Sequence, residues 1–399
     1  MFRSRTTICA WIALVAALLG LVFAGLSTFD YAAHLDRGLH DVHCSFIPGA
    51  KATSDGEACR AAMYSPYSAL LKDSRWGGIP ISLFALGAFT FYLGFAAYLL
   101  LGGRTLSRRA LWFFGIVSFA PLTVSVAMLV ISLTKLGQVC KTCAGIYSAS
   151  VLLALAGAFA LTSLRSDEAR RPSHWMMPLI WLLGLGLATL VPAVVYAASV
   201  PDHRPFLTRC GELQQAKPKQ GELVSLRGAR PAQTALFFED PLCPTCKAFH
   251  ERLAAERVLE RLDAELSLFP LDNECNWMLD SPLHPGACIV SKAVLCGGDQ
   301  ARMVLEWVYE NQESVANAGK SGPKVLKALL QQRWGENLVR CIDDRKTETR
   351  LNNHLHFASD NGIPVSTPQM YLGKRRICDE DTDIGLRYTL NELAPEVLK

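Results

Sequence analysis

Hydrophobic residues are concentrated in the first half of the chain, where five long stretches contain no Asp, Glu, Lys, Arg or His. A helix of about 20 residues, at roughly 1.5 Å per residue, crosses a hydrocarbon core of about 30 Å. A helix buried in a soluble protein rarely stays uncharged on every face for that length. The pattern therefore predicts five membrane-spanning helices, over Thr7–Phe29, Ile79–Leu101, Ala110–Thr134, Cys143–Leu164 and Trp175–Val200.

The arginines between these stretches predict how the helices are oriented. If the spans alternate in direction, three short arginine-bearing segments lie on one side, which should be cytoplasmic. The first stretch could be a cleaved signal peptide, but its length and the spans behind it favour a retained helix. We therefore expect a multi-pass protein of the cell inner membrane whose C-terminal part is periplasmic. The arginines are Arg3, Arg5, Arg104, Arg108, Arg109, Arg165, Arg170 and Arg171.

The 13 cysteines agree with that orientation. All except Cys9, which lies within the first span, fall on the predicted extracytoplasmic side, where disulfides persist. The net charge of +4 comes largely from the arginines between the spans, so it gives no reason to expect a nucleic-acid partner.

Beyond the fifth span the composition becomes polar, and a second part of the chain begins. The segment Thr234–Phe238 is typical of a buried strand. It runs into the CxxC motif Cys243–Cys246, and an amphipathic helix is predicted from Lys247 to about Leu262. Strand, CxxC and helix in this order form the thioredoxin pattern. Within it, Cys243 would be the exposed sulfur that exchanges with a substrate.

A second thioredoxin marker lies downstream. The segment Ser366–Pro368 precedes the strand-like Gln369–Leu372 and resembles the cis-proline segment of thioredoxins, with an ordinary trans turn proline as the alternative. Pro368 would then help to align an extended substrate beside the cysteines. About 95 residues separate the strand-like Leu266–Leu271 from Thr367, which predicts a helical insertion.

The soluble part carries six further cysteines, an even number that suggests structural bridges with 15 possible pairings. We expect His250 to be a solvated helix residue and His284 to be a turn residue. The six cysteines are Cys210, Cys275, Cys288, Cys296, Cys341 and Cys378.

In the membrane part, Cys140 and Cys143 occupy the point where a polar turn becomes the fourth span. Helix positions i and i+3 approach to about 5–6 Å, close enough for a disulfide. A helix N-terminus also stabilises a thiolate, which makes the pair competent for exchange. Half of a zinc site is the alternative, but the other CxxC belongs to the soluble part, so we expect no metal.

A second pair, Cys44 and Cys59, lies in the first outer loop around the Pro48-Gly49 turn. A flexible disulfide there could exchange with an outside partner and hand electrons inward to Cys140. A purely structural staple of the loop is the alternative.

Three segments together resemble the vitamin K epoxide reductase family, over roughly residues 7–165. They are Cys59–Tyr67, the Trp76–Pro80 entry to the second span, and Cys140–Cys143. The resemblance implies a four-helix bundle that encloses a quinone. The 14 residues between the two loop cysteines are more than bacterial members of the family usually have.

The resemblance also implies a role for each residue. Cys143 would reduce the quinone, Cys140 would exchange with Cys59, and Cys44 would receive electrons from a partner. Ser65 matches the family's serine near the quinone oxygen. Tyr147, one turn after Cys143, could donate a hydrogen bond to the quinone, although tyrosines at this depth are often only membrane anchors.

We therefore expect a multi-domain protein: an α-helical transmembrane bundle of four helices plus a fifth span, followed by an α/β thioredoxin-like domain with a helical insertion. The expected boundaries are 1–165 for the bundle, 166–204 for the fifth helix and linker, and 205–399 for the thioredoxin-like domain. The expected activity is the oxidation of secreted or periplasmic protein thiols, with electrons passed to ubiquinone or menaquinone. A reductase or isomerase with reversed electron flow and a redox sensor with static disulfides are the alternatives.

Overall fold

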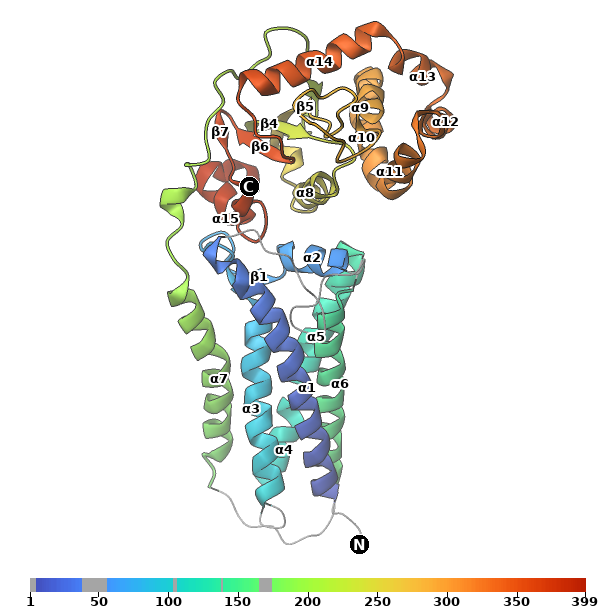
Figure 1. Cartoon of the computed structure of the whole chain (residues 1–399). Helices are drawn as coiled ribbons and strands as arrows, with labels where there is room; N and C mark the ends of the chain where they lie inside the picture. The colour runs from blue at the N-terminus through green and yellow to red at the C-terminus, as the bar shows by residue number, and fades with distance from the viewer. Residues whose placement is uncertain (1–4, 38–55, 103–105, 138, 165–173) are drawn as a thin grey trace. The chain divides into compact units, whose positions relative to one another are not determined.

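The computed structural model describes residues 5–37, 56–102, 106–137, 139–164 and 174–399. The chain forms two compact units, Met1–Asp202 and His203–Lys399. The first consists mainly of helices, and the second contains a five-stranded sheet with helices around it (Figure 1).

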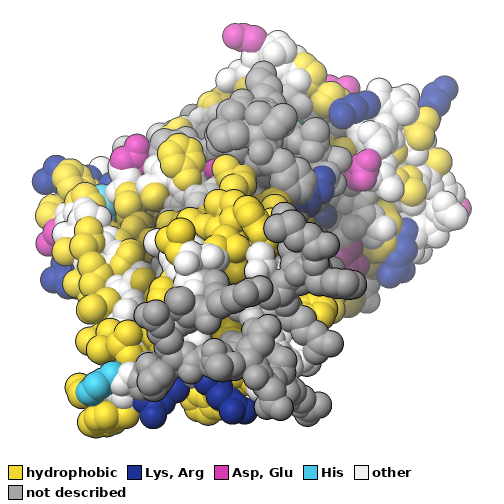
Figure 2. Space-filling model, turned by 90° about the horizontal axis from the view of Figure 1, so that it is seen from below, with side chains coloured by type: hydrophobic (Ala, Val, Ile, Leu, Met, Phe, Trp, Pro, Cys, Tyr) yellow, Lys and Arg dark blue, Asp and Glu magenta, His cyan; other side chains and the backbone are white. Residues whose placement is uncertain are grey.

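The first unit confirms the prediction of five apolar helices. Within the described residues, five helical segments are long and apolar enough to cross a membrane. Outward-facing hydrophobic side chains gather over this part of the molecule when it is seen from below (Figure 2), as expected for a surface that contacts lipid. The spans are Thr6–Asp36, Ile81–Gly102, Arg108–Leu136, Lys141–Ser163 and Met177–Phe206. Their α-helices are α1 (Arg5–Ala33), α3 (Ile81–Gly102), α4 (Arg108–Val117), α5 (Ala120–Ile131), α6 (Lys141–Ser163) and α7 (Met177–Ser199).

The third span differs from the single helix that was predicted, because it is interrupted between α4 and α5. Pro121 lies in the first turn of α5 and has no N–H to donate to the carbonyl of Val117. The hydroxyl of Tyr92 donates to that carbonyl instead, at 2.6 Å. The span then ends in a π-helical turn, Ser132–Leu136.

Helix α1 packs against both α3 and α6, α4 and α5 pack on α6, and α7 packs on α3. The approach of α7 to α3 depends on Gly87, where an added Cβ would lie 2.2 Å from the carbonyl oxygen of Ala188. Small residues at such contacts let helix backbones come close in a membrane.

The helices alternate in direction. At one end, the Arg108 guanidinium donates to the carbonyl of Leu164, which joins the start of α4 to the end of α6. At the other end, Arg75 donates to the carbonyl of Ala197 near the end of α7, at 2.6 Å. The Arg75 end also carries α2 (Gly56–Tyr64) and the short strands β1 (Ala69–Leu70) and β2 (Ile79–Pro80).

The second unit is built on a sheet of order β3-β5-β4-β6-β7. Strands β4 and β5 are parallel, and the other pairs are antiparallel. A parallel pair joined by helix α8, with an antiparallel strand beside it, is the arrangement of the thioredoxin fold, so the predicted fold class is confirmed. The strands are β3 (Val224–Ser225), β4 (Gln233–Glu239), β5 (Leu262–Leu268), β6 (Gln369–Leu372) and β7 (Arg375–Arg376), and the flanking helices are α8 (Pro244–Ala255) and α15 (Leu386–Leu393).

The predicted insertion between β5 and β6 consists of six α-helices. It packs against the sheet through one large hydrophobic cluster that includes Val290, Val304 and Leu330. The helices are α9 (Ala287–Cys296), α10 (Ala301–Glu310), α11 (Gln312–Ser321), α12 (Pro323–Trp334), α13 (Glu336–Ile342) and α14 (Arg345–Asp360).

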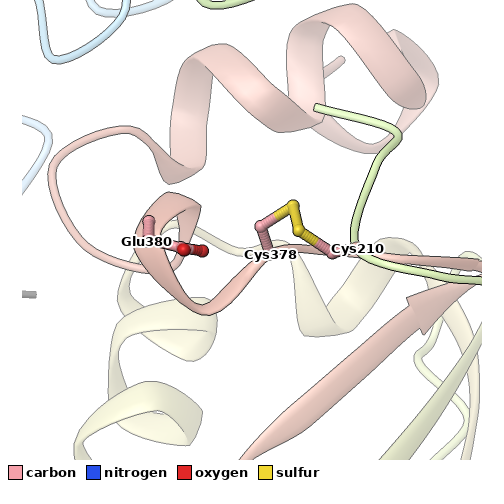
Figure 3. A group of neighbouring side chains, drawn as sticks. All are labelled: Cys210, Cys378 and Glu380. Atoms are coloured by element: carbon pink, nitrogen blue, oxygen red, sulfur yellow. A yellow bond between two sulfur atoms is a disulfide. The ribbon is translucent and has the colours of Figure 1, made fainter. Parts of the chain in front are cut away.

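Three disulfides resolve the pairing that the sequence left open: Cys210–Cys378, Cys275–Cys288 and Cys296–Cys341. The carboxylate of Glu380 lies near the first of them (Figure 3). Cys210, Cys378 and Glu380 are close enough together to hold a metal ion. Because the two sulfurs are bonded to each other, however, they are not thiolates available to a metal.

Two predictions about helix α8 are wrong. The helix after the CxxC ends at Ala255 rather than near Leu262, because the chain turns at Arg257, which has a positive φ of 60°. Val258 and Leu262 continue the helical spacing of apolar residues, but they are buried in the core after the turn. His250 is buried rather than solvated, and its ring packs 5.3 Å from that of Tyr309.

Candidate functional site

The first candidate site lies at the start of α6. Cys140 is the residue before the helix, and its carbonyl accepts the N–H of Ala144 at 3.0 Å. Its sulfur lies 2.9 Å from the hydroxyl of Thr142. Cys140 is buried, whereas Cys143, on the first turn, is partly exposed, and both are free thiols. Hydrogen bonding with Cys143 lowers the pKa of Cys140 to about 6, although burial acts in the opposite direction.

Helix α2 brings the loop cysteine to this pair. The sulfur of Cys59 lies 2.9 Å from the sulfur of Cys140. An S–S bond is about 2.04 Å long, so the two sulfurs are in contact but unbonded, at a distance suited to exchange. Cys59 is itself disulfide-bonded. Its predicted partner Cys44 lies outside the described residues.

A cavity of about 630 Å³ is lined by Cys59, Cys140 and Cys143. Ligand pockets in proteins commonly measure about 300–1,000 Å³. Most of the lining is apolar or aromatic, and all five spans contribute to it. Examples are Phe89 of α3, Met128 of α5 and Leu182 of α7. An apolar molecule therefore fits the cavity better than a polar one.

The predicted ligand contacts Ser65 and Tyr147 also line this cavity. The hydroxyl of Ser65 donates to the carbonyl of Ala62 at 2.8 Å, so it would have to rotate to donate to a ligand. The hydroxyl of Tyr147 lies beside Ser132 and Cys143. The structure thus brings Cys59, Ser65, Cys140, Cys143 and Tyr147 to one cavity.

The second candidate site lies at the junction of β4 and α8. Cys243 is the N-cap residue of α8, with Pro244 in the first turn. Its sulfur lies 2.8 Å from the hydroxyl of Thr245 and 3.6 Å from the carbonyl oxygen of Thr367. These neighbours leave Cys243 only 5% exposed, so the expectation of an exposed sulfur is wrong. Cys246 is fully buried.

The two thiols of this pair ionise very differently. Hydrogen bonding with Cys246 lowers the pKa of Cys243 to about 5. Burial raises the pKa of Cys246 well above its usual value. A thiolate is the nucleophile and the better leaving group in exchange. Cys243 is therefore suited to exchange with substrates and Cys246 to resolve the mixed disulfide.

Pro368 lies beside this pair, directly before β6. The Thr367–Pro368 peptide bond is cis, as predicted. The Thr367 carbonyl faces α8, where it also accepts from the hydroxyl of Thr245 at 3.2 Å. The N-terminal end of β6 is thereby placed next to Cys243.

Two further polar residues near the Cys243–Cys246 pair were not predicted. Glu239, the last residue of β4, is fully buried, and one carboxyl oxygen accepts the hydroxyl of Tyr309 at 2.9 Å. The other oxygen has no hydrogen-bond partner in the part of the chain that the structure describes. Burial raises the pKa of Glu239 to about 8. An acidic residue at the end of an otherwise apolar strand was the signal that could have identified it.

The insertion also contributes Gln312. Its side-chain amide donates to the carbonyls of Pro241 and Cys243, both at 3.0 Å. These bonds fix the turn that carries the first cysteine. Nothing in the sequence near Gln312 indicated this contact.

Residues 11–158 match the model of the vitamin K epoxide reductase family. No curated protein sequence matches the chain significantly. Among solved structures, reduced DsbA1 from Neisseria meningitidis is similar at 13% identity, over 47% of this chain and 91% of that one, with a TM-score of 0.33. The oxidoreductase DsbA from Xylella fastidiosa is similar at 22% identity, over 44% and 95%, with a TM-score of 0.30.

Residues 11–158 therefore form a domain of the vitamin K epoxide reductase family, within a membrane protein whose paired cysteines make it a thiol–disulfide oxidoreductase.

Proposed function

We propose that the chain oxidises protein dithiols at Cys243–Cys246 and passes the electrons to a membrane quinone through two further cysteine pairs. The electrons move from Cys243–Cys246 to Cys44–Cys59, then to Cys140–Cys143. Each exchange breaks one disulfide and forms another, so two electrons and two protons pass at each step. The observation that carries the proposal is the meeting of Cys59, Cys140 and Cys143 at one apolar cavity of about 630 Å³.

The volume and the apolar lining of the cavity support a quinone as the acceptor at the membrane end of this route. A bound quinone supplies a two-electron acceptor that moves within the bilayer. The apolar walls would hold the ring, Ser65 and Tyr147 would offer hydroxyls to its oxygens, and Cys143 would face it. Cys140, with its lowered pKa, would exchange with Cys59. Ubiquinone and menaquinone both fit this description.

The ionisation of Cys243 supports oxidation rather than reduction of substrates. A lowered cysteine pKa stabilises the reduced pair, which makes the corresponding disulfide a stronger oxidant. The alternative with reversed flow needs a disulfide that is hard to reduce. Equilibration with glutathione buffers distinguishes the two, because an oxidising pair stays reduced at glutathione ratios that oxidise a thioredoxin-like reductant.

Glu239 has a role in this proposal as the proton acceptor for Cys246. The two groups interact electrostatically within the buried interior, and the free carboxyl oxygen is available to take a proton. Since burial raises the pKa of Glu239 to about 8, the carboxyl can both receive and release a proton near neutral pH.

We further propose that the cysteine-bearing end of the bundle faces the periplasm. Residues 1–165 would form the quinone-reducing part, residues 166–204 the tether, and residues 205–399 the part that meets secreted protein thiols. Joining the soluble pair to the bundle makes the exchange between them intramolecular, at an effective concentration on the order of millimolar.

A quinone assay tests the proposal directly. Purified full-length protein, given a reduced dithiol protein and a soluble ubiquinone analogue, should consume one quinone for each disulfide formed. Cys143→Ala should abolish consumption, whereas Cys9→Ala should leave it unchanged, because Cys9 lies in the bundle and donates to the carbonyl of Ala156 away from the cavity. No consumption by the intact protein contradicts the proposal.

A further inference from the structure

The polar segment between β5 and α9 places a histidine beside the soluble cysteine pair. His284 lies on a turn, as predicted, and its Nδ1 is 2.7 Å from Oδ2 of Asp240. Its backbone N–H donates to the carbonyl of Leu271, and its own carbonyl accepts the N–H of Ala287, both at 3.0 Å. The backbone of His284 is thus held on both sides and its imidazole by Asp240, while the side chain remains 22% exposed to solvent.

Asp240 connects this histidine to Cys243. Its carboxylate is fully buried and accepts the N–H groups of Leu242 at 2.7 Å and Leu271 at 2.8 Å. Its backbone carbonyl accepts the N–H of Cys243 at 3.0 Å. The carboxylate therefore belongs to the turn that presents the first cysteine, and its negative charge opposes a thiolate there unless a cation neutralises it.

The groups that act on His284 come from three elements, and all are negative when ionised. They are Asp240 after β4, Asp272 after β5 and Cys243 at the start of α8. Asp272 is also buried, where it accepts the N–H of Gly286 at 2.9 Å. Hydrogen bonding with Asp240 raises the pKa of His284 above its usual value.

We propose that His284 and Asp240 form a charge switch that sets the oxidising strength of Cys243–Cys246. When His284 is protonated, the pair is neutral and the Cys243 thiolate is favoured. When His284 loses its proton, the buried charge of Asp240 opposes the thiolate and the disulfide becomes a weaker oxidant. His284 acts through Asp240 and Cys243, so it is a positioning residue. The CxxC motif itself contains no cationic residue, so the positive charge comes from His284, which lies in the insertion between β5 and β6.

The inference rests on the proposed role of Cys243–Cys246 in oxidising dithiols, but its test needs no quinone. Reaction with glutathione converts the Cys243–Cys246 disulfide and two thiols into the reduced pair and glutathione disulfide. Pulse alkylation of the full-length protein, followed by peptide mass spectrometry, reports both the ionisation of Cys243 and the fraction of the pair that is reduced. Both readouts can be measured even if the protein does not reduce a quinone, so failure of the proposed function and failure of this inference are distinguishable.

The variants are His284→Gln, which removes the charge, and His284→Lys, which keeps a charge at all working pH values. In His284→Gln the alkylation midpoint of Cys243 should rise by about one pH unit. The equilibrium with glutathione should move about tenfold toward the disulfide at pH 6 and converge with the wild type at high pH. His284→Lys should keep the low midpoint and lose the pH dependence.

His356→Gln serves as the matched control, because His356 is exposed on α14 and its ring lies 4.6 Å from that of Trp277. It should behave as the wild type. An unchanged midpoint in His284→Gln overturns the proposal. So does a His284→Lys variant that matches His284→Gln, since the histidine would then have only a structural role.

Discussion

The hydroxyl of Thr245 is one of the groups that stabilise the thiolate of Cys243, and it can be removed without touching either cysteine. It lies 2.8 Å from the Cys243 sulfur. A hydrogen bond to a charged group contributes about 1.5–3 kcal/mol, so Thr245→Ala should raise the alkylation midpoint of Cys243 by about one pH unit. Iodoacetamide alkylation as a function of pH measures the midpoint, which we expect near 5 in the wild type because hydrogen bonding with Cys246 lowers the pKa of Cys243.

Thr349→Ala is the control for this change, because Thr349 is an exposed threonine on α14. Its midpoint should equal that of the wild type. Cys246 should stay unreactive over the same pH range, since burial raises its pKa. A wild-type midpoint near that of a free thiol would contradict the assignment of Cys243 as the exchanging sulfur.

Glu239 carries a second prediction, on rate and on stability. Glu239→Gln should slow exchange at Cys246 by about a hundredfold, because general base catalysis contributes about 10²–10⁴. The folded pKa of Glu239, about 8, lies above its unfolded value. The favourable contribution of the protonated carboxyl is therefore complete below the unfolded pKa of 4.5 and is lost as the pH rises to about 8. Relative to the wild type, the variant should gain stability over this pH range and keep that gain at higher pH.

Stopped-flow mixing with a dithiol measures the rate, and denaturant unfolding at pH 6 and pH 9 measures the stability. Glu313→Gln, an exposed change on α11, is the control and should alter neither. Equal rates for wild type and Glu239→Gln would assign the proton to another acceptor.

At the scale of elements, α2 and the start of α6 bring their cysteines into contact. Because the sulfurs of Cys59 and Cys140 are 2.9 Å apart, removal of the resolving thiol should trap a bond between them. In Cys143→Ala, most of the protein should contain a Cys59–Cys140 disulfide, seen by mass spectrometry of non-reduced peptides. Cys9→Ala should contain none. A Cys143→Ala protein without this bond would mean that the loop and helix pairs do not exchange.

A helix or strand was predictable from the sequence where its limits depend on a local pattern of residues alone. Uncharged runs longer than a bilayer is thick predicted the five spans, and strand β6 was predicted with the bounds that the structure gives it. The end of α8 was missed because Val258 and Leu262 keep helical spacing while the backbone turns at Arg257. The break at Pro121 was missed because apolar composition conceals a lost hydrogen bond.

At the scale of the whole molecule, the sequence identified the cysteines but not their neighbours. Spacing could not choose among 15 pairings, since partners such as Cys210 and Cys378 are 168 residues apart in sequence. Gln312 and His284 were missed as site residues for the same reason, because each reaches the turn before α8 from an element distant in sequence. Glu239 lies only four residues before Cys243, and there the acidic end of an apolar strand was the local signal.

Membrane orientation provides the prediction at this scale. The two ends of α7 offer matched reporter positions, Trp175 and Pro201, which are both exposed. Since arginines collect at the Trp175 end of the bundle, that end should be cytoplasmic. Pro201→Cys should react with a membrane-impermeant maleimide added to intact cells, and Trp175→Cys should react only after the membrane is permeabilised. The reverse pattern would place both cysteine pairs of the bundle on the reducing side, where disulfides do not persist.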